Sequence, residues 1–138
     1  MSKRNFGRAA AALALAGSAL LGLSGTADAA QGAPFIGDGY ANNTHAVWCV
    51  QHNINYFLNR TTQADRPAPL AEDGLWGPQT KSAVQWLQAH TFISGRSLLQ
   101  DGYVGQLTGN AIISDGDPYY VGSYDAYCWQ YIPTTYGP

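Results

Sequence analysis

Charge is scarce in this amino-acid sequence. Only 12% of its 138 residues are charged, with seven Lys and Arg against nine Asp and Glu. Three of the basic residues lie within the first eight positions, so residues 30–138 keep four basic side chains against eight acidic ones. Proteins that bind nucleic acids or anionic membranes need a cationic surface. The composition therefore excludes both kinds of partner and favours a neutral or mixed-charge one.

Histidine and cysteine are also few, with three His and two Cys in the whole chain. A zinc peptidase needs several His and Asp ligands, and an EF-hand calcium site needs many oxygen ligands at fixed offsets. A glycosidase needs two opposed carboxylates in a cleft. Glu72 and Asp73 are adjacent, and Asp73 belongs to a turn motif, while Asp115 and Asp117 fall in a loop. We therefore predict no catalytic residue, no metal site and no cofactor.

A long apolar run is absent except near the N-terminus. Bases at positions 3, 4 and 8 precede an Ala- and Leu-rich run from about residue 9 to 23, and small residues follow up to Ala29. This order is typical of a secretory signal peptide, and the run is shorter than the roughly 20 residues that a membrane-spanning helix needs. We predict a signal peptide over 1–29, cleaved after Ala29 or Ala30, and a secreted product that does not stay in the membrane. An uncleaved anchor is the alternative.

The two cysteines, Cys49 and Cys128, are expected to form a disulfide in an oxidising compartment. The bond would close a loop of about 80 residues, which chain-entropy arguments value at about 4 kcal/mol. In the alternative, His45, Cys49 and His52 share one helix face at positions i, i+4 and i+7 and bind zinc together. The disulfide further predicts that the C-terminal tail folds over this face, where Tyr56 also points.

Apolar residues at helical spacing predict three helices. The first is capped by Asn43 or Thr44, the second begins at Pro78, and Pro67 and Pro69 interrupt the chain between them. The predicted segments are an irregular lead-in over 30–42, helices over about 44–59, 78–90 and 106–113, and a Tyr-rich tail over 114–138 packed on the first helix. The residues predicted to face the core are Val47, Val50, Ile54, Phe57, Leu58, Ala83, Val84, Leu87, Leu107, Ala111 and Ile112.

One phrase of eight residues occurs twice. Asp73-Gly74-Leu75-Trp76-Gly77-Pro78-Gln79-Thr80 recurs 28 residues later as Asp101-Gly102-Tyr103-Val104-Gly105-Gln106-Leu107-Thr108. The Asp carboxylate can accept backbone N–H bonds and shape a turn, and the glycine after it can adopt a positive φ. We expect the two residues that follow to pack inward and the second glycine to admit the chain tightly into the next helix. The predicted turn residues are Asp73, Gly74, Gly77, Asp101, Gly102 and Gly105.

The two phrases, together with Val50-Gln51-x-x-Ile54-Asn55 and Ala83-Val84-x-x-Leu87-Gln88, resemble the peptidoglycan-binding-domain-like family. The resemblance covers about residues 46–113. It implies an all-α domain over 43–113, a small three-helix orthogonal bundle of the kind usually attached to cell-wall hydrolases. Gln106 replaces the second proline of the pattern, Gly109 stands where an aromatic residue is common, and the tail has no counterpart.

The resemblance implies a non-catalytic module that binds peptidoglycan of the bacterial cell wall and is extracellular or wall-associated. Sugar rings stack on aromatic side chains, so the expected contacts are Trp76, Gln79, Trp86 and Tyr103, in a shallow groove between the Asp-Gly loops and the second helix. Packing is the alternative role for these aromatic residues. The alternative function is a secreted interaction or inhibitor protein that binds an extracellular protein partner through its Tyr-rich tail. A wall hydrolase is a third.

Overall fold

The computed structural model describes residues 32–137, so the predicted signal peptide and its cleavage at Ala29 or Ala30 lie outside the described residues. Over this range the chain forms four α-helices, one two-stranded hairpin and a short 3-10 helix. The predominance of helix agrees with the predicted all-α class. Within residues 32–137, no helix is long and apolar enough to cross a membrane.

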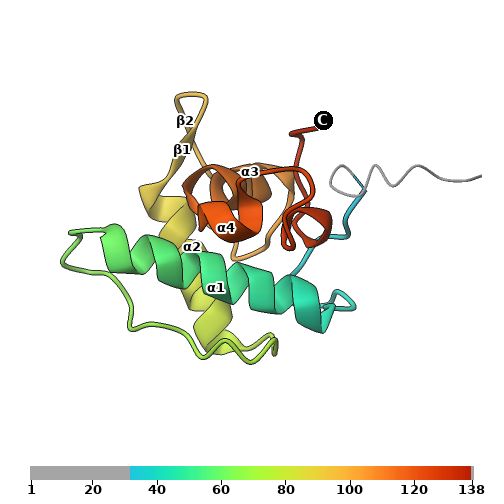
Figure 1. Ribbon diagram of the computed structural model, residues 1–138. Helices are drawn as coiled ribbons and strands as arrows, with labels where there is room; N and C mark the ends of the chain where they lie inside the picture. The colour runs from blue at the N-terminus through green and yellow to red at the C-terminus, as the bar shows by residue number, and fades with distance from the viewer. Residues whose placement is uncertain (1–31, 138) are drawn as a thin grey trace, which may run out of the picture.

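Helix α1, Thr44–Arg60, lies across one side of the molecule and contacts both α2 and α3 (Figure 1). It begins at the predicted cap, because the side-chain oxygen of Asn43 accepts the backbone N–H of His45 at 2.8 Å. The predicted apolar stripe faces the core, with Phe57 half-buried and the other members fully buried. Polar residues of α1 are buried as well, namely Gln51, Asn53 and Asn55. The helix is therefore covered on more than its apolar face.

Helices α2, Pro78–His90, and α3, Gln106–Asp115, begin where the sequence predicts, and α3 continues two residues further. Their predicted core residues are buried except Leu107, which is 59% exposed. The prediction for Leu107 is wrong because the next residue, Thr108, points inward to a buried hydrogen bond. Adjacent residues of a helix point about 100° apart, so Leu107 turns toward solvent.

The segment after α2 forms a hairpin of β1, Phe92–Ile93, and β2, Arg96–Ser97, which extends from the body of the molecule (Figure 1). Its two-residue turn has φ values of 52° at Ser94 and 76° at Gly95. Two consecutive positive φ angles are typical of the tight turns that match the twist of a hairpin.

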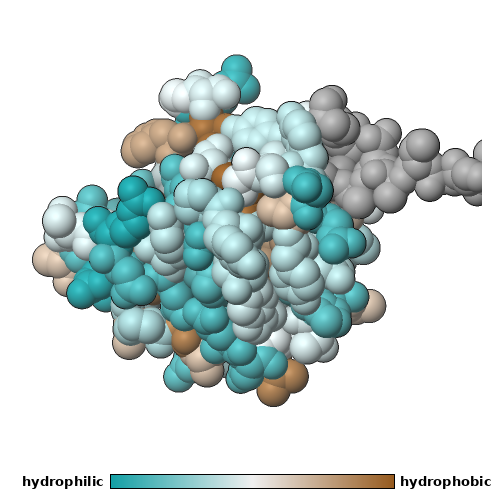
Figure 2. Space-filling view, in the orientation of Figure 1, coloured by the Kyte–Doolittle hydropathy of each residue, from teal (hydrophilic) through white to brown (hydrophobic). Residues whose placement is uncertain are grey.

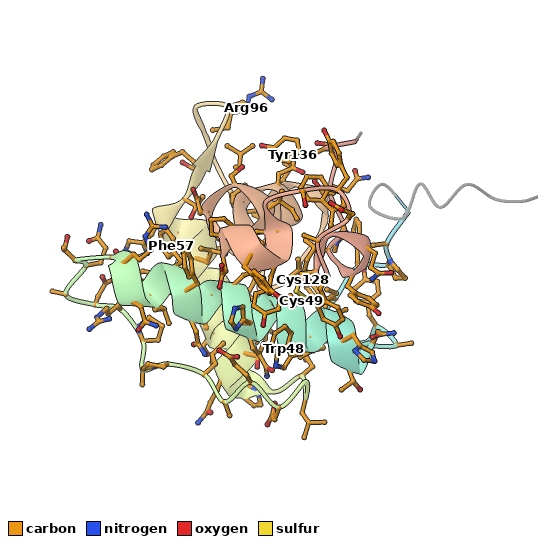
Figure 3. The ribbon with its side chains drawn as sticks, in the orientation of Figure 1. Trp48, Cys49, Phe57, Arg96, Cys128 and Tyr136 are labelled. Carbon is orange, nitrogen blue, oxygen red and sulfur yellow. A yellow bond between two sulfur atoms is a disulfide. The ribbon has the colours of Figure 1, made fainter. Side chains whose placement is uncertain are left out.

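The tail over residues 116–137 packs on α1 and α3. It contains α4, Pro118–Val121, and the 3-10 helix η1, Trp129–Tyr131. A disulfide joins Cys128 to Cys49 in the middle of α1, as predicted, and both residues are fully buried (Figure 3). The bond uses the Cys49 sulfur, so it removes the thiolate that the zinc alternative required.

Further along, the tail is attached to α3 by a buried amide. The side-chain oxygen of Asn110 accepts the hydroxyl of Thr134 and the backbone N–H of Thr135, the latter at 2.9 Å. Beside it, a Cβ atom at Gly109 would lie 1.6 Å from the carbonyl oxygen of Pro133. The tail backbone thus fills the space that any side chain at position 109 would need.

The close approach at Gly109 gives a prediction with an unusual sign. Replacing a helical glycine by alanine ordinarily stabilises a protein by about 1 kcal/mol. We expect Gly109→Ala to lower the free energy of unfolding by about 3 kcal/mol, because the methyl group must displace Pro133.

Urea unfolding measures this difference, with Gly77→Ser as the matched control. Gly77 has an extended backbone, with φ −152°, and beyond its chain neighbours no atom lies within 4 Å of the position that a Cβ atom would take. Serine at this N-cap should leave stability within about 0.5 kcal/mol of the wild type or raise it. A Gly109→Ala protein as stable as the control would contradict the contact between tail and helix.

Candidate functional site

Two buried glutamines hold the two Asp-Gly loops. The side-chain N–H groups of Gln51, on α1, donate to the carboxylate of Asp73 at 3.0 Å and to the carbonyl of Leu75 at 3.1 Å. They also donate to the hydroxyl of Thr80 at 3.1 Å. The side-chain oxygen of Gln51 accepts the N–H of Gly74 at 2.9 Å. One amide therefore fixes the first loop to both α1 and the first turn of α2.

Gln88, on α2, makes the corresponding bonds to the second loop. Its N–H groups donate to Asp101 at 2.9 Å and to the carbonyl of Tyr103 at 2.9 Å. They also donate to Thr108 at 3.0 Å, and its oxygen accepts the N–H of Gly102 at 2.9 Å. The unit helix–loop–helix is therefore used twice, with α2 shared. The sequence motifs contain both glutamines. Their pairing with the loops could not be recognised from the sequence, because the number of residues between glutamine and loop differs between the two copies.

The glycine after each aspartate has a positive φ, 70° at Gly74 and 76° at Gly102. Each also lies against the preceding helix, since a Cβ atom at Gly74 would lie 2.7 Å from the carbonyl oxygen of Thr44. A Cβ atom at Gly102 would lie 2.8 Å from Cγ of Lys81. Both conformation and space therefore require glycine. The later glycines of the phrase, Gly77 and Gly105, have extended backbones and act as N-caps.

The residues after each turn glycine do not all pack inward as predicted. Leu75 is 66% exposed and Trp76 is half-buried, whereas Val104 is fully buried. In an extended segment, successive side chains point to opposite sides, so only one of each pair can face the core. The predicted inward packing of Leu75 is wrong for this reason.

Trp76 and Tyr103 are connected by the lead-in segment. The indole N–H of Trp76 donates to the carboxylate of Asp38 at 2.9 Å, and the ammonium of Lys81 donates to the same carboxylate at 2.6 Å. That ammonium lies 6.0 Å from the ring centroid of Tyr103. The lead-in is held in place by paired backbone hydrogen bonds between Ile36 and Val104, at 3.2 and 2.8 Å. It therefore lies between the two loops.

Two hollows lie beside the two loops, with volumes of about 430 and 400 Å³. Trp76 and Gln79 line the first, and Tyr103 lines the second, where Phe35 and Tyr40 join it. Leu70 and Leu98, which stand 28 residues apart like the phrases themselves, occupy corresponding walls. The two loops are therefore similar in their conformation and also in the surface that lies beside each of them.

Trp86 lies apart from the other three expected contacts. Its ring stacks on His90, with centroids 4.3 Å apart, and meets Phe57 of α1 at 5.9 Å. Among residues 32–137, no group accepts its buried indole N–H. Trp86 therefore contributes to the contact between α1 and α2 and lines neither hollow.

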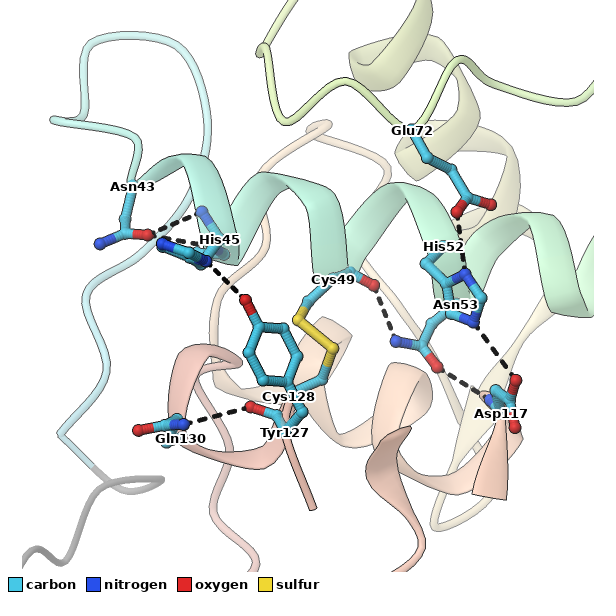
Figure 4. The surroundings of a disulfide bond; sticks show 11 residues. Asn43, His45, Cys49, His52, Asn53, Glu72, Asp117, Tyr127, Cys128 and Gln130 are labelled. Atoms are coloured by element: carbon cyan, nitrogen blue, oxygen red, sulfur yellow. Dashed lines mark hydrogen bonds and ion pairs between the residues drawn. A yellow bond between two sulfur atoms is a disulfide. The ribbon is translucent and has the colours of Figure 1, made fainter. Parts of the chain in front are cut away.

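The two histidines of α1 are engaged by the loop and the tail (Figure 4). His52 lies between Glu72, at 2.9 Å from Nδ1, and Asp117, at 3.2 Å from Nε2. The ring of His45 contacts the hydroxyl of Tyr127. Over the described range, no three His, Cys, Asp or Glu side chains are grouped as metal ligands.

No family model matches the chain, and no curated protein sequence and no solved structure matches it either.

The glutamine network predicts a strong effect for an isosteric substitution. Gln51→Glu keeps the shape of the side chain but replaces its donors with a carboxylate beside Asp73. We expect a loss of about 3 kcal/mol in the free energy of unfolding, because buried donors and acceptors lose their partners. Gln79→Glu, on the exposed first turn of α2, is the control and should change stability by less than about 0.5 kcal/mol. Equal urea midpoints for the two variants would contradict the role given to Gln51.

The ion pair of the lead-in predicts a titration. The hydrogen bond from Lys81, and next the one from Trp76, hold the pKa of Asp38 below its ordinary value of 3.8. A depressed folded pKa means that the stabilisation is present above the unfolded value and is lost as pH falls through the folded one. NMR titration of the Asp38 carboxyl should give a midpoint below 3.8, and Lys81→Met should move it upward. An unchanged midpoint in Lys81→Met would refute the assigned cause.

Proposed function

We propose that the chain is a non-catalytic module that binds peptidoglycan of the bacterial cell wall. The proposal rests on the resemblance of the two phrases to wall-binding modules and on the duplicated loop with its two hollows. This duplication is the observation that carries it. A glycan strand is a polymer of repeating units, and two similar hollows on one surface suit a ligand whose chemistry repeats.

The side chains at the hollows suit sugar rings. Trp76 borders the first hollow, and Phe35, Tyr40 and Tyr103 border the second. Aromatic faces stack against the C–H faces of sugars, and the hydroxyls of Tyr40 and Tyr103 are polar groups that can hydrogen-bond a sugar. Gln79 supplies an exposed amide at the first hollow for hydroxyl or acetamido groups.

The strip between the hollows carries paired charges. Asp38 accepts from both Trp76 and Lys81, so opposite charges neutralise each other there. A neutral sugar crossing the strip would meet hydrogen-bonding groups and no uncompensated charge. Trp86, which was expected among the contacts, is left out of the proposed surface because it packs between α1 and α2.

One observation favours a second candidate, a secreted protein that binds an extracellular protein partner. The second hollow is bordered by apolar side chains that are unusually exposed: Phe35 at 44%, Tyr40 at 46%, Leu99 at 77% and Leu107 at 59%. A peptide segment could cover them. By contrast, the face seen in Figure 2 is mainly hydrophilic, with apolar side chains in small separate patches.

Co-sedimentation of the purified chain with isolated cell walls tests the proposal. We expect saturable binding, and a loss of about tenfold in affinity for Tyr40→Ala, because a central aromatic contact is commonly worth more than 1 kcal/mol. Tyr119→Ala, an 80% exposed tyrosine of the tail, is the control and should bind like the wild type. The turbidity of the wall suspension should stay constant.

Wall binding that is absent, or that Tyr40→Ala leaves unchanged, would refute the proposed surface. A pull-down from culture medium that recovers a stoichiometric protein, with no wall binding, would instead support the protein-partner candidate.

A further inference from the structure

A third hollow, of about 430 Å³, opens between α1, the loop at Glu72–Gly74 and the tail. Three of its lining residues are labelled in Figure 4, namely His45 of α1, Glu72 of the loop and Tyr127 of the tail. Trp48 of α1, Tyr120 of α4 and Tyr127 line it, and Glu72 and Asp73 form its opposite side. Neither the repeated phrase nor the proposed wall-binding surface accounts for the three aromatic rings.

The three rings stand nearly perpendicular to one another. Trp48 meets Tyr120 at 70° with centroids 5.3 Å apart, and meets Tyr127 at 78° and 5.9 Å. Tyr120 and Tyr127 meet at 77° and 6.5 Å. The rings therefore form three walls of a corner. Aromatic faces carry negative potential, and such corners attract cations to their faces.

The acidic side of the hollow is rigidly positioned. The carboxylate of Glu72 accepts from Asn55 at 2.9 Å and contacts His52 at 2.9 Å. Asp73 uses its Oδ1 for Gln51 and Leu75, which leaves Oδ2 for a ligand. The hydrogen bond from the Leu75 backbone, and next that from Gln51, hold the pKa of Asp73 below its ordinary value. Its carboxyl therefore stays charged at neutral pH.

The positive groups near the hollow do not outweigh these acids. The four Lys and Arg of residues 32–137 all lie outside its lining. His52 stacks behind Trp48 at 4.8 Å and can donate to Glu72 and Asp117 together only with a hydrogen on each ring nitrogen. The imidazole of His45 lines the hollow as well, and the three carboxylates of Glu72, Asp73 and Asp117 still outnumber the two histidines.

We propose that this hollow binds the primary ammonium group of a lysine-type side chain on a peptide. The three rings would cover the ammonium and its methylene chain, and Oδ2 of Asp73 would accept one of its N–H bonds. A primary ammonium satisfies this acceptor, whereas a quaternary ammonium has no hydrogen to donate. The site extends beyond wall binding and does not depend on it, since any lysine-bearing peptide carries the group.

The tail gains a role from this site, because it contributes two of the three walls. The backbone N–H of Cys128 donates to the carbonyl of Tyr120 at 2.9 Å, and Cys128 itself is bonded to Cys49. The disulfide thereby holds Tyr120 and Tyr127 against Trp48. A chain that ended after α3 would keep both Asp-Gly loops and lose the aromatic corner.

Titration of the purified, disulfide-bonded chain with Nα-acetyl-lysine methylamide tests the site. Calorimetry gives the affinity, and NMR follows the indole signal of Trp48. We expect Nα-acetyl-norleucine methylamide, which keeps the four side-chain carbons of lysine and lacks only the terminal ammonium, to bind about tenfold more weakly, because it can make neither the cation–π contact nor the charged hydrogen bond. The proposal is overturned if the lysine probe does not bind, or if it binds no better than the norleucine analogue.

Variants locate the site. Tyr127→Ala removes a ring that is 41% exposed, and Glu72→Gln keeps an oxygen for Asn55 while removing one charge. Each should weaken the lysine probe severalfold. Tyr124→Ala and Asp65→Asn, matched changes outside the hollow, should leave the affinity unchanged.

Two further outcomes would be decisive against the proposal. Equal affinity in Tyr127→Ala and Tyr124→Ala, with Glu72→Gln also unchanged, would place the probe elsewhere. If tetramethylammonium bound more tightly than the lysine probe, the site would prefer a quaternary ammonium, and the proposed primary ammonium would be wrong. Circular dichroism confirms that each variant is folded, and Tyr40→Ala should bind the lysine probe normally because it alters only the wall-binding surface.

Discussion

The side-chain amides of two buried glutamines are the constraint on which the rest of the structure depends. Each bonds three groups of an Asp-Gly loop and one threonine in the first turn of the following helix. A buried polar network is favourable when every member has a partner and costly when one is missing. Such a network tolerates a single arrangement of the loop. This network therefore fixes the positions of the helices on either side of each loop and of the surfaces beside the loops.

The tail completes the molecule in a different way. It adds no helix comparable to the first three, yet it lies against α1 through the disulfide and against α3 through Asn110 and Gly109. These contacts bury Val121, Trp129 and Ile132 in the common core. The tail is consequently part of the same core as the helices, joined to them by a covalent bond and by buried side chains.

Much of the fold follows from local chemistry, and most of the site does not. Asn43, Pro78 and the apolar spacing mark the helices because capping and periodicity act over a few residues. The disulfide follows from the presence of only two cysteines. The predictions for Leu75 and Leu107 were wrong because only one of two adjacent side chains can face the core. Which of the two is buried depends on contacts with residues that are distant in the sequence. The roles of Gln51 and Gln88, and the corner of Trp48, Tyr120 and Tyr127, were not predicted because only folding brings these groups together.

The bond between Cys49 and Cys128 spans a sequence separation of 79 residues and so encloses most of the described chain in one covalent ring. The exposed, proline-containing stretch between α1 and the first loop, residues 61–69, belongs to that ring. A protease that cut there would open the ring without releasing a fragment, because both new ends stay linked through the two sulfurs. The pieces remain at high effective concentration, so the helices on either side of the cut can stay docked.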